Sequence, residues 1–318
     1  MRSKLTGYDV GALLYCPANA HGSIVGAIVE QRFPTPYSLA FCLEDTVRED
    51  AVADAERMLR GTLSRIASAA EGGSFFLPPI FVRVRSPEQL LRLAEYAPFS
   101  SILRGFILPK FFLENCGAYL AAIRSIGRTE EYFYMPVFES AAMIPPQTRR
   151  EALTEVRAQL DTVSGSILNI RVGGNDLSHA FGLRRPANRT IYDLRPVADI
   201  LIDIVAAFGT QYVVSGPVWE YYSGEGWEEG LRREMELDLL NGFTGKTVIH
   251  PNQIPVVNEM LRVSQRDYAD ARAILNWDTG SGSLVSASED GGRMNEYNTH
   301  SRWARRILLR AERYGVRA

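Results

Sequence analysis

The chain has 318 residues, a formal net charge of −2 and a hydrophobic content of 46%. This length suits one large α/β barrel or two average domains. The near-neutral charge argues against a nucleic-acid partner, because such a partner needs a basic stripe. No run of about 18 apolar residues is present, as a membrane-spanning helix would require, and the N-terminal residues lack the apolar core of a signal peptide. We therefore predict a cytoplasmic protein with no membrane partner.

The three cysteines are Cys16, Cys42 and Cys116, and none of them forms a CxxC pair. Their odd number does not indicate a disulfide framework. Cys16 and Cys42 lie in apolar runs, so we interpret them as small buried hydrophobic residues. This usage is typical of a reducing compartment.

Eight short apolar runs alternate along the chain with longer amphipathic segments. The runs are almost continuously apolar, which is typical of parallel strands that are covered on both faces. They cover residues 12–17, 38–45, 80–85, 105–110, 132–139, 167–172, 211–217 and 246–251. The segments between them place apolar residues at helical spacing. We expect helices over 50–70, 87–97, 115–126, 148–160, 196–208, 228–241 and 253–275.

Eight consecutive strand-plus-helix units predict an α/β fold, a (β/α)8 TIM barrel with a C-terminal loop-helix extension. The alternation implies parallel strands joined by right-handed crossovers. A doubly wound open sheet is the alternative. That fold usually has five or six strands and a GxGxxG turn, and no such turn follows the first expected strand. We place the barrel domain at residues 1–276 and a lid loop with its helix at residues 277–318.

The C-terminal extension differs in composition from the rest of the chain. Residues 278–292 (DTGSGSLVSASEDGG) are rich in Gly, Ser and Asp, which predicts a mobile loop. A final helix is expected over 298–314, with Trp303, Ile307 and Leu308 on one stripe. Such a stripe needs a surface to pack on, either on the barrel or on a neighbouring subunit.

Polar or charged residues stand at the ends of the expected strands, which is where the active site of a TIM barrel lies. They are, in chain order, Asn19, Glu44, Asp45, Arg83, Arg85, Lys110, Glu139, Gly173, Gly174, Asn175, Asp176, Ser215 and His250. Charges that end apolar strands need a reason, because burial of an unpaired charge is costly. Ser215 has no nucleophile elbow around it, which argues against hydrolase chemistry of the Ser-His-Asp type.

A magnesium site is the explanation that this set favours. Carboxylate oxygens and water are the ligands that Mg²⁺ prefers in proteins. Glu139 and Asp176 follow consecutive strands, so in a barrel they are close enough to share one ion. The alternative is a set of internal salt bridges that hold this end of the barrel together.

Seven segments carry a resemblance to a known family. They are LLYCPAN at 13–19, CLEDTV at 42–47, FVRVRS at 81–86, ILPKF at 107–111, FES at 138–140, GGNDLSHAFG at 173–182 and GFTGKTVIHPNQIPVVNEML at 242–261. In order, spacing and strand position they resemble the citrate lyase β-subunit and malyl-CoA lyase group, often placed with the HpcH/HpaI aldolases. LYCPA, FCLED and ILPKF are also similar to a branch described as TIM-barrel C–C bond lyases in tellurite-resistance and stress gene clusters.

The resemblance implies a metal and a substrate clamp. Glu139 and Asp176 would coordinate Mg²⁺, which would chelate the carboxylate and keto oxygens of the substrate and stabilise an enolate. Arg83 would hold the same oxygens through a charge-assisted pair. Glu44 and Asp45 would lie near the metal-bound water, where they would either orient it through hydrogen bonds or transfer protons.

Further positions in the matching motifs complete the expected site. Gly173 and Gly174 would let backbone approach the ligand, and Asn19 and Lys110 are expected to bind substrate. His250 lies in a segment that serves the family as a strand end, so we interpret it as structural or peripheral.

The segment GGRMNEY at 291–297 occupies the place of the family's mobile catalytic segment, which places Glu296 where the family has an acid/base aspartate from a neighbouring subunit. The extra methylene of glutamate matters, because a misplacement of about 1 Å can cost on the order of 100-fold in rate. The alternative role for Glu296 is a carboxylate that stabilises the start of the final helix.

The aromatic loop at 219–222 (WEYY) differs from the family pattern. It either stacks on a sugar or a base of the ligand or covers the barrel rim, and the rim is favoured.

These observations predict a Mg²⁺-dependent carbon–carbon bond lyase or aldolase that acts on a 2-oxo acid or acyl-CoA-like substrate. The alternatives are a thioester hydrolase, a lyase on a nucleoside-linked metabolite, or a non-catalytic ligand-binding barrel in a stress operon. The family arrangement implies a homo-oligomer, a trimer or hexamer, in which each tail covers the barrel of its neighbour. We expect a homotrimer with Glu296 near the metal of the adjacent chain.

Overall fold

The computed structural model describes residues 5–19, 22–96, 101–126, 132–278, 280 and 282–317. Within them, eight parallel strands close into one barrel in chain order. The strands are β1 (Ala12–Pro17), β2 (Ser38–Cys42), β3 (Ile80–Arg83), β4 (Leu103–Leu108), β5 (Phe133–Phe138), β6 (Ile170–Val172), β7 (Val214–Gly216) and β8 (Phe243–Val248). Every strand overlaps a predicted apolar run, and β1 pairs with β8 to close the barrel. The predicted TIM barrel is confirmed.

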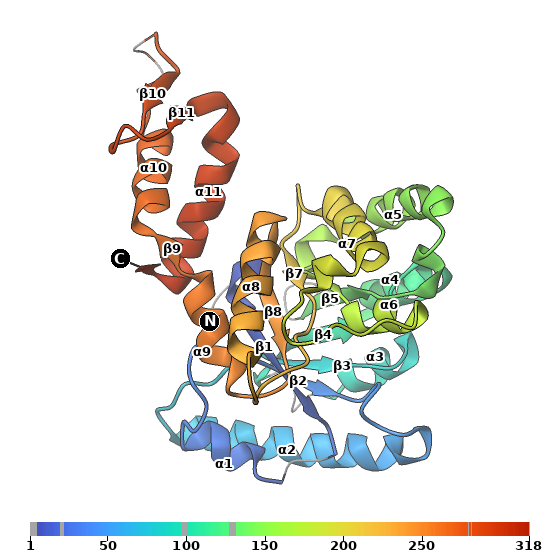
Figure 1. The fold of residues 1–318 in the computed structure, drawn as a ribbon. Helices are drawn as coiled ribbons and strands as arrows, with labels where there is room; N and C mark the ends of the chain where they lie inside the picture. Colours follow the sequence, from blue (N-terminus) through green and yellow to red (C-terminus); the bar gives the residue numbers. More distant parts are fainter. Residues whose placement is uncertain are drawn as a thin grey trace. The chain divides into compact units, whose positions relative to one another are not determined.

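Helices surround the strands, as Figure 1 shows. They are α1 (Ile24–Val29), α2 (Val52–Gly72), α3 (Pro87–Ala94), α4 (Leu113–Ile126), α5 (Pro146–Asp161), α6 (Gly174–Ala180), α7 (Arg195–Phe208) and α8 (Trp227–Leu240). Helix α3 begins as its sequence predicts, because the Ser86 hydroxyl accepts a hydrogen bond from Gln89 N at 3.3 Å and Pro87 follows the cap. Helices α1 and α6 were not predicted, since six or seven residues are too few for helical periodicity to show.

Apolar side chains fill the interior of the barrel. One cluster gathers residues from most of the strands, namely Val10, Leu13, Ala40, Phe81, Ile107, Met135, Val137 and Leu168. Such layers make a TIM barrel a packed core with its binding site at one end. The three cysteines are free and buried, and burial had been expected of Cys16 and Cys42.

The chain forms two compact units, Met1–Val257 and Asn258–Ala318. The segment predicted as one helix over 253–275 is two, α9 (Gln253–Leu261) and α10 (Gln265–Leu275), separated by β9 (Val263–Ser264). The single-helix prediction was wrong because Ser264 is an N-cap: its hydroxyl accepts a hydrogen bond from Asp267 N at 3.1 Å and starts a new helix. Strand β9 pairs with β12 (Val316–Arg317).

The second unit is built on a pair of helices. Helix α11 (Tyr297–Tyr314) packs against α10 around a cluster made of Val263, Ala271, Ile274, Ala304, Ile307 and Ala311. Trp303 and Leu308 pack on the edge of that cluster. The apolar stripe of the last helix therefore has a partner in α10, and the compact division falls before the expected boundary at residues 276 and 277.

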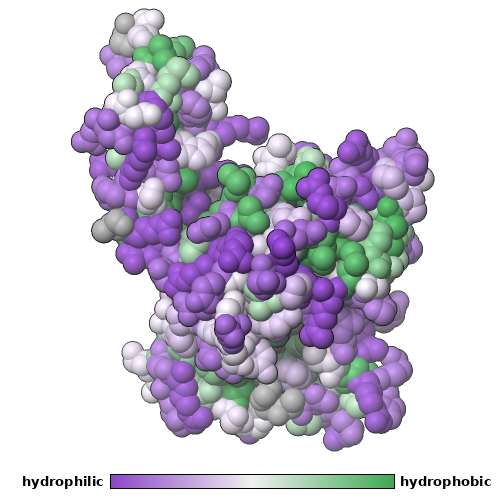
Figure 2. Space-filling model, in the orientation of Figure 1, coloured by the Kyte–Doolittle hydropathy of each residue, from purple (hydrophilic) through white to green (hydrophobic). Residues whose placement is uncertain are grey.

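Part of the expected loop at 278–292 is a strand. β10 (Val285–Ala287) pairs antiparallel with β11 (Met294–Glu296). The composition concealed this hairpin because β10 is only three residues long, too short for an alternating pattern to be recognised, and all three residues are exposed. Leu284, Val285 and Met294 are exposed apolar side chains there, and Figure 2 shows hydrophobic surface at that end of the second unit.

No helix among the described residues is long and apolar enough to cross a membrane.

A cluster of buried charges holds α8 against β8. Lys246 on β8 is fully buried, and its ammonium group lies 2.7 Å from a carboxylate oxygen of Glu234 and 2.7 Å from one of Asp238. Arg185 lies 2.9 Å from the other oxygen of Glu234, and the Tyr192 hydroxyl donates to Asp238 at 2.7 Å. Burial raises the pKa of Asp238, and Lys246 opposes that shift. The positive and negative charges of this cluster balance only while Lys246 is present.

We therefore expect Lys246→Met to destabilise the protein by about 3–5 kcal/mol, because it leaves two buried carboxylates short of a cation. Urea unfolding followed by circular dichroism measures the change. The matched control is Arg57→Met, which removes an arginine from an exposed pair with Asp54 and should change little. Equal stability of the two variants would contradict the role assigned to Lys246.

Candidate active site

A cavity of about 260 Å³ opens at the C-terminal ends of the barrel strands. Its lining comes from strands β1, β3, β5, β6 and β8 and from the loops that follow β2, β6, β7 and β8. The lining residues are Tyr15, Asp45, Thr46, Arg83, Val137, Glu139, Arg171, Val172, Gly173, Gly174, Asn175, Asp176, Val218, Thr247 and Ile249. This is the end of the barrel where TIM-barrel active sites lie.

Arg83, the last residue of β3, is the central cation of this site. It is 8% exposed, and its guanidinium lies 3.0 Å from Glu44, 3.0 Å from Asp45 and 2.7 Å from Glu139. Burial lowers the pKa of Arg83, but Glu139 and the other anionic neighbours more than offset this and raise the pKa well above its ordinary value. The side chain therefore stays charged and joins the ends of β2, β3 and β5.

Glu139 follows β5 and is 5% exposed. Its Oε1 accepts from Arg83 at 2.7 Å and from the backbone N–H of Lys110 at 3.0 Å. Burial raises the pKa of Glu139 to about 7; Arg83 opposes this shift, and the like charge of Asp176 reinforces it. Glu139 and Asp176 are thus close enough to repel each other, as a pair that shares a cation would be.

The glycine pair after β6 makes room for these groups. A Cβ at Gly173 would lie 2.2 Å from Oε2 of Glu139, and one at Gly174 would lie 2.7 Å from Cβ of Pro217. Both glycines line the cavity. They were expected to admit the ligand, and the structure packs Glu139 against Gly173 and Pro217 against Gly174.

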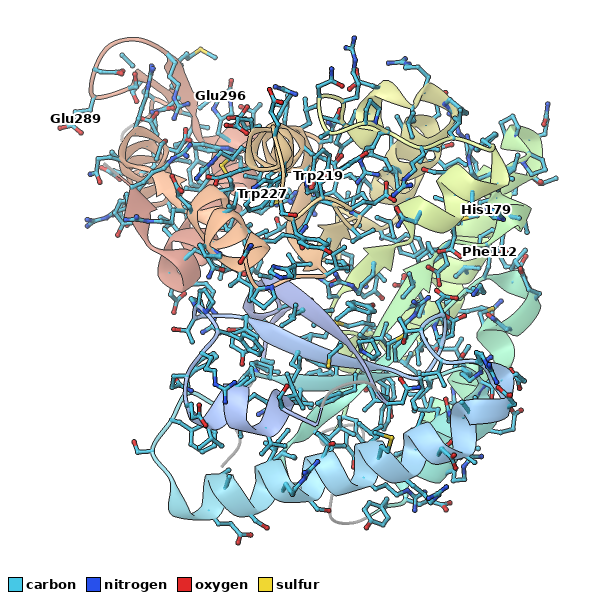
Figure 3. All side chains as sticks on the ribbon, turned by 60° about the horizontal axis from the view of Figure 1, so that its bottom comes forward. Phe112, His179, Trp219, Trp227, Glu289 and Glu296 are labelled. Atoms are coloured by element: carbon cyan, nitrogen blue, oxygen red, sulfur yellow. The ribbon has the colours of Figure 1, made fainter. Side chains whose placement is uncertain are left out.

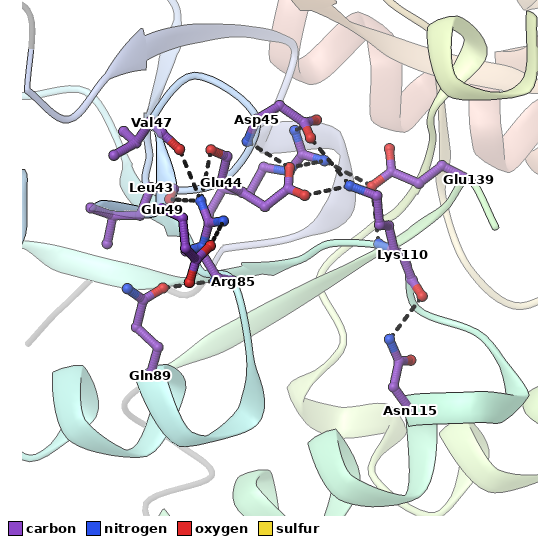
Figure 4. A network of polar contacts seen from close by, with 11 residues as sticks. Leu43, Glu44, Asp45, Val47, Glu49, Arg85, Gln89, Lys110, Asn115 and Glu139 are labelled. Atoms are coloured by element: carbon purple, nitrogen blue, oxygen red, sulfur yellow. Dashed lines mark hydrogen bonds and ion pairs between the residues drawn. The ribbon is translucent and has the colours of Figure 1, made fainter. Parts of the chain in front are cut away.

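The acidic pair after β2 is tied to Lys110, and Figure 4 shows Lys110 between this pair and Glu139. Its ammonium group contacts Glu44 and lies 3.2 Å from Asp45. Burial raises the pKa of Glu44. Burial also favours the neutral form of Asp45, but a hydrogen bond with Glu44 and the charge of Arg83 lower the pKa of Asp45 to about 2. Neighbouring carboxyls with separated pKa values are the usual basis for acid and base roles.

Lys110 has a left-handed backbone conformation with φ of 48°, which is uncommon for a residue other than glycine. This conformation accompanies the hydrogen bond from its backbone N–H to Glu139. Asn115 stabilises the turn, because its side-chain amide donates to the Lys110 carbonyl at 2.9 Å. Strained backbone of this kind is often found at functional sites.

Two predicted site residues are not part of this group. In the described part of the chain, Asn19 does not line the cavity, and it follows β1 as a half-buried turn residue. Glu296 belongs to the second unit, where its backbone N–H donates to Nδ1 of His300 at 2.9 Å. Its acid/base role stays a prediction.

His250 and the aromatic loop after β7 have structural surroundings. The ring of His250 stacks on Tyr222 with a centroid distance of 4.5 Å, and its Nδ1 accepts from Asn252 N at 3.1 Å. Trp219 is fully buried and its indole donates to the Trp227 carbonyl at 3.0 Å, an arrangement that Figure 3 places beside α8. These contacts favour a role in covering the barrel rim.

Tyr15, Arg171 and Thr247 line the cavity but were not among the predicted site residues. Arg171 had a signal in the sequence, because a charge inside the apolar run at 167–172 is as unusual as Arg83 in its own run. It was not selected because the interpretation of this segment centred on the glycine turn that follows. Tyr15 and Thr247 carry no such signal, since both residue types are common in strands.

The donor set at Glu139 and Asp176 fits a divalent cation. Both carboxylates line one cavity, and their mutual repulsion favours a bound positive charge. Among the described residues, no group of three or more His, Cys, Asp or Glu side chains could hold a metal ion. A two-carboxylate site leaves most coordination positions to water and substrate oxygens, as Mg²⁺ sites commonly do.

A closed (β/α)8 barrel with carboxylates and arginines around a cavity at the C-terminal strand ends has the arrangement of a barrel enzyme for small anionic substrates. The chain belongs to the family described as C–C bond lyases of the TIM-barrel fold, whose model matches residues 4–316. The protein is therefore a carbon–carbon lyase by family.

Two curated relatives match the chain, one named as a thioesterase and one as a lyase. The chain is 27% identical over 303 residues to a (3S)-malyl-CoA thioesterase of Cereibacter sphaeroides, which covers 95% of this chain and 94% of the relative. A shorter match of 74 residues, 38% identical, covers 23% of the chain and 22% of an L-malyl-CoA/beta-methylmalyl-CoA lyase of the same species.

Solved structures share the fold. Protein CitE from Mycobacterium tuberculosis, in complex with magnesium, acetoacetate and coenzyme A, has a TM-score of 0.62 and 20% identity, covering 95% of this chain and 98% of that one. A citrate lyase from Burkholderia xenovorans has a TM-score of 0.66 and 14% identity, covering 97% and 93%. At these identities the likeness shows the fold alone.

The close contact at Gly173 is testable. We expect Gly173→Ala to destabilise the protein by about 1–3 kcal/mol, because the added methyl must displace Glu139 or the backbone. Gly117→Ala on α4 is the control: a Cβ there meets nothing within 4 Å, so the helix should gain slightly in stability. Thermal unfolding of both variants decides the matter, and similar melting temperatures would show that Glu139 does not pack tightly on Gly173.

Proposed function

We propose that the protein is a Mg²⁺-dependent lyase that cleaves or forms a carbon–carbon bond in a 2-oxo acid or acyl-CoA-like substrate. The observation that carries this proposal is the convergence of Glu139, Asp176 and Arg83 on one cavity. The family of C–C bond lyases supplies the reaction class. The complex of CitE with magnesium, acetoacetate and coenzyme A supports the metal and the kind of substrate.

In this proposal, Glu139 and Asp176 hold the metal, and bound Mg²⁺ supplies a Lewis acid for the negative charge that develops on the substrate oxygen. Glu139 is prepared for this role by two donors to the same oxygen, Arg83 and the Lys110 amide. These contacts leave Oε2 without an assigned hydrogen bond within the described residues. That oxygen is therefore the candidate ligand atom.

Arg83 both positions Glu139 and faces the substrate. Its Nε is buried and has no hydrogen-bond partner among the described groups. A buried donor without a partner is costly, so an oxygen of the substrate carboxylate is a suitable acceptor for it. The family resemblance assigns the matching arginine the same contact.

Proton transfer is assigned to the acidic pair. Asp45 lines the cavity and stays ionised to low pH, whereas Glu44 binds its proton more tightly than usual. The pair can therefore exchange a proton with a substrate carbon or with water near the metal. Lys110 holds both carboxylates in place and is the candidate for a further contact with the substrate.

Thioester hydrolysis is the second candidate, and the thioesterase relative that spans 95% of this chain favours it. The cavity of about 260 Å³ lies below the ~300–1,000 Å³ typical for drug-sized ligands. It suits the small acyl part of a CoA ester rather than the whole cofactor. A thiol reagent distinguishes the two reactions, since hydrolysis releases free CoA whereas carbon–carbon cleavage leaves the thioester intact.

The metal site predicts a pH-dependent affinity for Mg²⁺. Because the folded protein holds the proton on Glu139 up to about pH 7, a proton competes with the metal below that pH. Calorimetric titration should give an affinity roughly tenfold weaker at pH 6 than at pH 8, with little change above pH 8. Glu139→Gln should abolish most of the affinity and all of this pH dependence.

The control for that titration is Glu30→Gln, at an exposed carboxylate paired with Arg32, which should behave as the parent protein. If Glu139→Gln bound Mg²⁺ as tightly as the parent protein, the assignment of Glu139 to the metal site would be wrong.

We also propose a homotrimer in which Glu296 serves the site of an adjacent chain. Support comes from the family resemblance of the tail and from the exposed apolar residues Leu284, Val285 and Met294 on the hairpin. Exposed apolar patches often mark interfaces.

Light scattering should report three chains per particle, and Glu296→Gln should lower turnover by about 100-fold while Mg²⁺ affinity stays unchanged. Glu289→Gln, on the same hairpin, is the matched control. A fully active monomer would contradict both the assembly and the shared site.

A further inference from the structure

Arg171 on β6 is a buried cation that lacks an anionic partner. It is 1% exposed and lines the same cavity as Glu139 and Asp176. Its guanidinium donates to the Thr247 hydroxyl at 2.5 Å and to the Asn169 side-chain oxygen at 3.5 Å. Within the described residues, no carboxylate lies within ion-pair distance of it. A third side-chain hydrogen bond joins Arg171 to Tyr15. A guanidinium carries five N–H donors, so these bonds leave donor capacity at the cavity.

Among the described residues, the other deeply buried arginines are neutralised. Arg83 contacts three carboxylates, as described above. Arg149 lies 2.8 Å from Asp203, and Arg185 lies 2.9 Å from Glu234. Each of these three buried arginines therefore has a carboxylate partner. Arg171 departs from that pattern in the lining of the candidate site.

The surroundings of Arg171 supply no hidden negative charge. Burial of the hydroxyl raises the pKa of Tyr15, so this neighbour stays a neutral phenol. Asn169 donates to Ser215 at 2.9 Å, and Ser215 donates to the Thr244 carbonyl at 2.9 Å, so this side of the barrel interior is polar but uncharged. Burial lowers the pKa of Arg171, interactions with Tyr15 that include a side-chain hydrogen bond oppose this shift, and the positive charge of Arg83 adds to it.

A bound anion would neutralise the unpaired positive charge of Arg171. A buried charge without a partner is costly, and a charge-assisted pair with a carboxylate repays much of that cost. Arg83 is already occupied by Glu44, Asp45 and Glu139, so Arg171 is the one cation of the described cavity lining that has no protein carboxylate. One unmatched positive charge corresponds to one negative charge, which favours a carboxylate over a phosphate of nearly two charges.

We propose that Arg171 is a specificity-determining residue that receives a second carboxylate of the substrate, distal to the 2-oxo acid group held at Glu139 and Asp176. The inference rests on the proposed function, because it assumes that the first anionic end lies at the metal site. Thr247 orients the guanidinium, and Tyr15 lines the same part of the cavity. The enzyme therefore selects a dianionic substrate over one that ends in a methyl group.

Two matched pairs of 2-oxo acids test this selection: oxaloacetate with 2-oxobutanoate, and 2-oxoglutarate with 2-oxopentanoate. The members of each pair have equal carbon numbers and differ by a terminal carboxylate or methyl group. Calorimetry on the full-length protein with Mg²⁺ should show that the parent prefers the carboxylate member of at least one pair. Arg171→Met should weaken binding of that member by about 10- to 100-fold and change binding of the methyl member by less than about threefold.

Arg171→Lys should recover part of the preference, since a point charge replaces a bidentate fork. A parent protein that binds both members of each pair equally would overturn the inference while leaving the lyase proposal intact. An Arg171→Met variant whose affinity falls equally for both members of a pair would also overturn the inference. If none of the four acids binds the parent with Mg²⁺, the proposed function fails, and the inference fails with it.

The stability of Arg171→Met is compared with that of Arg149→Met, which alters an arginine with a structural role. Arg171→Met removes an unmatched buried charge, so the protein without ligand should unfold at the same urea concentration as the parent or higher. Arg149→Met removes the partner of a buried carboxylate and should unfold at a lower concentration. A loss of stability in Arg171→Met as large as that in Arg149→Met would show a structural role and overturn the inference.

Discussion

The ion pairs of Arg83 are the interaction on which the site depends. One guanidinium at the end of β3 contacts two carboxylates that follow β2 and one that follows β5. Three segments that are separate in sequence are thereby fixed at the same end of the barrel. Because the guanidinium is buried, these attractions act in a medium of low dielectric and are stronger than they would be at the surface. The position of Glu139, and hence of the proposed metal, follows from this arrangement.

The charged groups of the cavity fall into two sets. Carboxylates gather where Arg83 and Lys110 balance them, and Asp176 adds a further negative charge next to Glu139. Arg171, by contrast, donates to hydroxyl and amide groups. A substrate with an anionic group at each end complements this division, provided that a cation lies between its first end and the two carboxylates. Charge complementarity of this kind contributes more to specificity than to affinity.

The sequence predicted what depends on periodicity and strand position. The eight apolar runs specified the barrel, and the rule that barrel sites lie at the strand ends placed Arg83, Glu139 and Asp176 among the candidates. The family resemblance then assigned Arg83 its role. Arg171 was missed because the interpretation of the run at 167–172 centred on the glycine turn that follows it. The break before α10 depends on a single capping serine, and the hairpin of the second unit depends on backbone pairing between exposed residues. Neither leaves a trace in hydrophobic patterning.

The left-handed conformation of Lys110 affects which substitutions the site can tolerate. The donor that holds Glu139 there is a backbone amide, so it is present with nearly any side chain at position 110. Asparagine or glycine would preserve the conformation at little steric cost. Proline would remove the donor, and a β-branched residue would oppose the φ of 48°. The orientation of Glu139 is thus maintained by most side chains at this position, whereas the contacts with Glu44 and Asp45 require the ammonium group of lysine.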